Sequence, residues 1–147
     1  MSDLYELQLA WELGDAVPEE VLDDLRWHLG LQDVGSSDGD GSECEPLLAG
    51  RGPASRIGGV LFGALARGPR GWSVTVRQEV HAEELSELDQ LLSRLAAHTA
   101  IVNGPVGQLR FYEDDAPDLL VAEAGAIARQ PLRSAGSELV PFLAGLA

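Results

Sequence analysis

Apolar and polar residues alternate along residues 4–13, and this period of two predicts a half-buried β-strand. The apolar members are Tyr5, Leu7, Leu9, Trp11 and Leu13, and the polar members between them are Glu6, Gln8 and Glu12. A helical period follows from Pro18 to about Leu29, with apolar residues at positions 21, 22, 25 and 29. The N-terminal part therefore predicts a strand followed by a helix.

The second half of the chain repeats this order. Alternation at Trp72, Val74, Val76 and Val80 predicts another strand, and a leucine stripe over residues 82–98 predicts an amphipathic helix. Acidic residues begin that helix and Arg94 lies near its end, which complements the helix dipole. Further strands are expected at residues 106–112, 118–123 and 126–130.

Residues 57–66 carry two conflicting signals. Their apolar spacing fits a helix, but Gly58, Gly59 and Gly63 would each destabilise a helix interior by about 0.5–1 kcal/mol relative to alanine. A Gly-Pro-Arg-Gly turn at residues 68–71 then leads into the next strand. We therefore favour a strand here, with both of its faces covered because apolar residues occupy both.

This order of elements predicts an α+β fold with a ferredoxin-like βαββαβ core, in which two helices cover one face of an antiparallel sheet. A C-terminal β-hairpin extension and a short apolar C-terminal segment follow, and we expect residues 138–147 to pack on the domain as a short helix. Residues 1–147 are expected to form a single domain. Residues 32–45 are acidic and rich in glycine and serine, which predicts a mobile loop.

The charge of the chain narrows the possible partners. The formal net charge is −14, and all ten basic residues are arginine. Residues 1–50 contain 13 acidic residues and one arginine, so most of the excess charge lies in the first third. This argues against binding to nucleic acid and to anionic membranes, both of which need a basic surface. The single cysteine and the absence of a basic, apolar leader favour a cytoplasmic protein.

Motifs that would carry catalysis are incomplete in this sequence. His81 and Glu83 match the first half of the zinc deaminase signature, but the second half needs Pro-Cys-x-x-Cys and only Cys44 is present. The acidic run at residues 38–43 does not place Asp and Glu at positions one and twelve of a calcium loop. No cofactor or metal site is predicted. Whether the chain is an enzyme stays open, and a non-enzymatic protein is favoured.

Two groups of polar residues remain as candidate binding sites. The first occupies the outward positions of the predicted strands, on the sheet face opposite the helices: Glu6, Gln8, Glu12, Thr75, Arg77, Arg110 and Tyr112. The second is an acidic patch on the first helix: Glu19, Glu20, Asp23 and Asp24.

The favoured function is that of a small acidic binding protein, such as an inhibitor, an immunity-type protein or an accessory subunit, which recognises a basic protein partner. The alternative is a dimeric enzyme or small-molecule-binding protein of the α+β-barrel type, in which two open sheet faces enclose a pocket. A third possibility is a self-associating structural domain without ligand or catalysis. The apolar segment at residues 57–66 and the apolar C-terminal segment motivate this third possibility.

Overall fold

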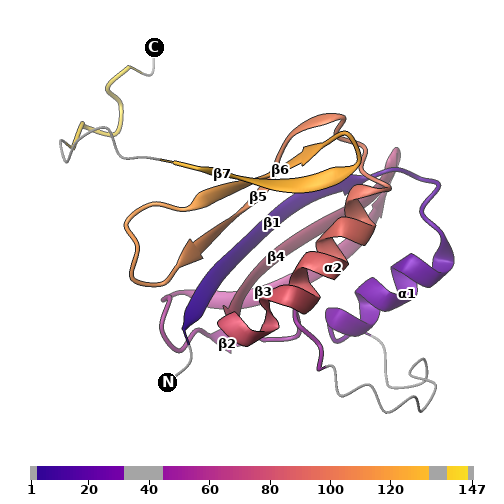
Figure 1. The fold of residues 1–147 in the computed structure, drawn as a ribbon, viewed down its shortest axis with the longest axis horizontal. Helices are drawn as coiled ribbons and strands as arrows, with labels where there is room; N and C mark the ends of the chain where they lie inside the picture. The colour runs from indigo at the N-terminus through magenta and orange to yellow at the C-terminus, as the bar shows by residue number, and fades with distance from the viewer. Residues whose placement is uncertain (1–2, 32–44, 133–138, 146–147) are drawn as a thin grey trace.

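The computed structural model describes residues 3–31, 45–132 and 139–145, which form a seven-stranded antiparallel open sheet and two helices (Figure 1). The strand order is β2-β3-β4-β1-β5-β6-β7. The strands are β1 (Leu4–Leu13), β2 (Gly52–Pro53), β3 (Val60–Gly68), β4 (Gly71–His81), β5 (Asn103–Phe111), β6 (Asp118–Glu123) and β7 (Ala126–Pro131). The mixed α+β class predicted from the sequence is therefore confirmed.

The two helices pack on the same face of the sheet (Figure 1). Helix α1 (Glu19–His28) begins after Pro18, and α2 (Leu85–Ala96) follows a 3₁₀ turn at Ala82–Glu84. Their buried leucines share one core with the odd-numbered residues of β1 and with the valines of β4. The apolar face of the strands and the leucine stripes of the helices thus enclose a single apolar layer.

Two helices do not cover seven strands. Strands about 4.8 Å apart give a sheet about 29 Å wide, whereas two helices of about 10 Å diameter cover about 20 Å. Helix α2 reaches the start of β7, where Ile127 packs against the core, but Arg129 further along that strand is exposed. One end of β5, β6 and β7 is therefore left open on the helix side.

Three expectations need correction or fall outside the described residues. Residues 60–68 form a strand as favoured, but β3 is not covered on both faces, since Val60 and Phe62 are exposed. The C-terminal residues 139–145 contain a turn rather than a packed helix, and their large apolar side chains are 71–94% exposed. Residues 32–44 of the expected loop lie outside the described residues. No helix in the described ranges is long and apolar enough to span a bilayer.

Candidate functional site

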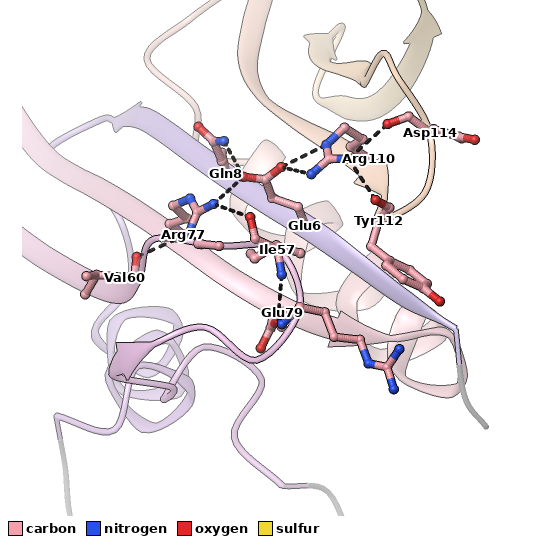
Figure 2. Close-up of polar contacts among 11 residues, drawn as sticks. Glu6, Gln8, Ile57, Val60, Arg77, Glu79, Arg110, Tyr112 and Asp114 are labelled. Atoms are coloured by element: carbon pink, nitrogen blue, oxygen red, sulfur yellow. Dashed lines mark hydrogen bonds and ion pairs between the residues drawn. The ribbon is translucent and has the colours of Figure 1, made fainter.

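The open face of the sheet, opposite the helices, holds a buried carboxylate at its centre. Glu6 lies on β1 and is only 6% exposed. Gln8 lies on the same face of β1, Arg77 projects from β4, and Arg110 projects from β5. The alternation of the central strands places these four side chains together (Figure 2).

Both oxygens of Glu6 are fully engaged. Its Oε1 accepts from Nε and Nη2 of Arg110, each at 3.0 Å, in a two-point contact. Its Oε2 accepts from Nη2 of Arg77 at 2.9 Å and from Nε2 of Gln8 at 2.8 Å. Burial would raise the pKa of Glu6, but the hydrogen bonds from Gln8 and Arg110 and the charges of both arginines outweigh it and lower the pKa. Glu6 is therefore a carboxylate held ionised, and its oxygens have no free position for a substrate.

Residues 54–59, between β2 and β3, fold over this face and bind to β4. The carboxylate of Glu79 accepts from the backbone N–H groups of Ser55, Arg56 and Ile57 at 2.7–3.1 Å. Arg77 donates to the carbonyl oxygens of Ile57 and Gly58, which joins this segment to the Glu6 cluster (Figure 2). Burial acts to raise the pKa of Glu79, and the backbone hydrogen bonds lower it by more. Residues 54–59 are thereby fixed over the part of the open face that β4 forms.

Of the other predicted open-face residues, Glu12 and Thr75 lie apart from this cluster and Tyr112 adjoins it. Both oxygens of Glu12 accept from Ser73 Oγ at 2.8 Å, near the opposite end of β1. Thr75 is exposed on β4. Tyr112 follows β5, and its ring centroid lies 5.6 Å from the guanidinium carbon of Arg56. The structure therefore brings together four of the seven predicted residues, places Tyr112 next to them through a 3.0 Å hydrogen bond from Arg110 Nη1 to its backbone carbonyl, and separates Glu12 and Thr75.

The predicted acidic patch on α1 is largely matched by arginines of the same chain. Arg26 Nη1 lies 3.0 Å from a carboxylate oxygen of both Glu19 and Asp23, and the hydrogen bond to Glu19 raises the pKa of Arg26. Arg94 Nη2 lies 2.7 Å from Asp24 Oδ2. Glu20 is exposed on the same helix. Much of the negative charge on this helix is therefore compensated at short range.

A second acidic cluster, which sequence reasoning missed, lies at one end of the sheet. β1 and β6 begin at this end, and β4 and β5 finish there. The backbone carbonyls of Asp3 and Leu4 accept from the backbone N–H groups of Ala82 and Tyr112, respectively. We call this region the acidic end, and its members are Asp3, Glu83, Glu84, Glu113, Asp114, Asp115 and Asp118. In the described part of the chain, Arg129 is the arginine paired with this group, 3.5 Å from Asp118. Four separate segments thus combine their negative charge.

The acidic end contains a cavity of about 340 Å³ on the helix-side face of the sheet, beyond the part that the two helices cover. Tyr5 and Phe111 form an aromatic wall, with ring centroids 5.5 Å apart. The remaining lining residues are Asp3, Leu109, Asp114, Ala116, Asp118 and Arg129. Within the described ranges, no group of three or more His, Cys, Asp or Glu side chains is arranged to hold a metal ion.

Two further residues missed from the sequence stabilise the segment before β2. Gln78 is buried on the helix side of β4 and bonds to the backbone N–H and carbonyl of Gly50. His28 is buried at the end of α1, and its Nδ1 accepts from the backbone N–H of Leu47 at 3.2 Å. A lone polar residue at an inward position of an apolar stripe was the available signal in both cases.

Comparison with protein-family models, curated proteins and solved structures finds no match to this chain.

Proposed function

We propose that this chain is a non-enzymatic protein that binds a basic protein partner at its acidic end. The observation that carries the proposal is the gathering of seven carboxylates from four segments at one end of the sheet, with a net charge of −14 for the whole chain. Such a surface accelerates encounter with a basic partner and disfavours acidic ones.

We include in this proposal a more specific description of the fold. The order β3-β4-β1-β5, with α1 between β1 and β3 and α2 between β4 and β5, supports a ferredoxin-like βαββαβ core. In this description, β6 and β7 are the C-terminal hairpin extension. A cytoplasmic location is proposed with it, supported by the single cysteine.

The alternative, an enzyme or small-molecule-binding dimer with paired open faces, has weaker support. Arg77 and Arg110 are both committed to Glu6, and residues 54–59 occupy part of the face that a second protomer would have to cover. The exposed apolar side chains of Val60 and Phe62 are the features that favour a homodimer. A monomer in light scattering would rule this alternative out.

The test of the proposed function compares two charge variants of equal size. One carries Glu83→Gln, Glu113→Gln and Asp115→Asn at the acidic end, and the control carries three exposed changes elsewhere: Asp15→Asn, Glu20→Gln and Asp89→Asn. Proteins captured by the wild-type chain are identified, and the affinity of one purified basic protein among them is measured at 50 and 300 mM NaCl.

Each exposed charge pair contributes roughly 0.5 kcal/mol, so the acidic-end variant should bind about tenfold more weakly at low salt. The control variant should bind much as the wild type does. Capture of no basic protein, or equal loss of affinity in both variants, would overturn the assignment to the acidic end.

A further inference from the structure

The cavity at the acidic end has the chemistry of a receptor for an organic cation. Its aromatic wall presents Tyr5 and Phe111, and π-systems attract a cation close to the ring. Its lining also includes the acidic residues Asp3, Asp114 and Asp118. An apolar wall beside acidic groups suits a ligand that is both partly apolar and positively charged.

The volume of the cavity indicates the size of that ligand. About 340 Å³ is far more space than a bare metal ion fills, and it lies at the lower end of the range for small-molecule sites. A side chain of several carbons with a charged head fits this space. The cavity lies on the helix-side face of the sheet, at the end of β5 and β6 that the two helices leave uncovered, so a side chain from another protein can enter without rearrangement of the helices.

One cation is already present at the cavity. Arg129, on β7, pairs with Asp118 at 3.5 Å while its side chain remains 61% exposed. Within the described ranges no arginine of the chain lies in ion-pair distance of the Asp3 or Asp114 carboxylates. The chain itself therefore shows a guanidinium accepted at one acidic side of the cavity, and two carboxylates remain for a second one.

We propose that this cavity binds one alkylguanidinium group, presented as an arginine side chain of the basic partner. This inference rests on the proposed function, because that function supplies the partner. A guanidinium is favoured over an ammonium because it is planar, weakly hydrated, able to stack on an aromatic ring and able to bridge two carboxylates. Asp3 and Asp114 pair with the incoming group, and Tyr5 and Phe111 contact its plane and its alkyl chain.

The experiment titrates N-acetyl-L-arginine amide into the ¹⁵N-labelled protein and follows amide chemical shifts. We expect saturable shifts confined to the cavity, at Tyr5, Leu109, Phe111 and Asp118, with a dissociation constant on the order of millimolar for a fragment of this size. The neutral isostere N-acetyl-L-citrulline amide should produce no saturable shift. N-acetyl-L-lysine amide should bind more weakly than the arginine compound.

Two variants move the affinity in opposite directions. Asp114→Asn should weaken binding of the arginine compound about two- to fivefold, as expected for the loss of one exposed charge partner. Arg129→Gln should strengthen binding about two- to fivefold, since it removes a competing cation and frees Asp118. An increase in affinity cannot arise from a destabilised protein, so the second variant keeps the test informative if the first unfolds.

The proposal is overturned if the arginine compound gives no saturable shifts, if citrulline or lysine amide binds equally well, or if the shifts lie away from the cavity. The outcomes also separate this inference from the proposed function. Arginine binding without capture of a basic protein would support the cavity and reject the partner. Capture of a basic protein that is lost in the acidic-end variant, without arginine binding, would support the partner and reject the cavity.

Discussion

Replacing Glu6 by glutamine is expected to destabilise the fold by about 2 kcal/mol. The substitution preserves the shape of the side chain but removes the charge shared by Arg77 and Arg110. Removal of one member of a fully buried ion pair typically costs about 3–5 kcal/mol, because the partner charge is left uncompensated. Glu6 is buried, but the arginine side chains are 20–23% exposed, so solvent stabilises part of their charge and lowers this value.

The assay is urea unfolding at pH 7, followed by tryptophan fluorescence, on the wild type, Glu6→Gln, Arg110→Gln and the double variant. For a chain of this length, 2 kcal/mol corresponds to a decrease of about 4–8 °C in the melting temperature. The double variant should be more stable than the sum of the single effects predicts, by at least about 1 kcal/mol, since both changes remove the same contact. Purely additive effects would show that the Glu6–Arg110 contact contributes nothing.

The pH dependence gives an independent test of the same contact. The pKa of Glu6 is lowered in the folded protein, so its contribution is fully present above the unfolded pKa, about 4.3, and is lost as pH falls through the folded pKa. The stability difference between wild type and Glu6→Gln should therefore stay constant from pH 7 to about pH 5 and shrink at lower pH. A difference that stays unchanged down to pH 2 would contradict the ionised state assigned to Glu6.

Three further predictions concern the loop, the buried histidine and the C-terminal segment. Glu79→Gln should speed hydrogen exchange at the amides of Ser55 to Ile57, whose N–H groups lose a charged acceptor, while exchange in the core stays unchanged. Burial lowers the pKa of His28 by more than the charge of Asp24 raises it, and the charge of Arg94 lowers it further. Stability should therefore fall as pH decreases from about 6.5 toward the lower folded pKa. His28→Gln should remove this pH dependence in urea unfolding. Removal of residues 139–147 should change the free energy of unfolding by less than about 0.5 kcal/mol, since residues 139–143 lie exposed; a loss above 1 kcal/mol would mean that this segment covers core.

The alternation of residues was enough to predict which side chains share a face. Leu7, Leu9 and Trp11 point toward the helices and Glu6 points away, because successive side chains of a strand alternate. The pairing of Glu6 with Arg110 could not be predicted from alternation alone, because their strands are separated by most of the chain. Which residues stand opposite each other depends on register, and register is fixed only once turns and core contacts are in place.

The acidic end and residues 54–59 could not be read from local pattern. Each acidic segment of the cluster is short and looks like an ordinary solvated turn, and only the strand order brings Asp3 beside Asp114 and Asp118. Residues 54–59 have no regular period, and their position depends on a carboxylate in β4, Glu79, which accepts their backbone hydrogens. Both features depend on the long-range topology of the sheet rather than on local secondary-structure propensity.

The central position of β1 has a consequence for synthesis on the ribosome. β1 is made first, yet it lies between β4 and β5, and its contact from Glu6 to Arg110 spans 104 residues of chain. At about 5–20 residues per second, roughly 5–20 s pass before β5 can close the second edge of β1. During that interval β1, whose odd-numbered residues belong to the core, has an unpaired edge. The nascent chain thus depends on early pairing with β4, or on a chaperone, to avoid aggregation before translation is complete.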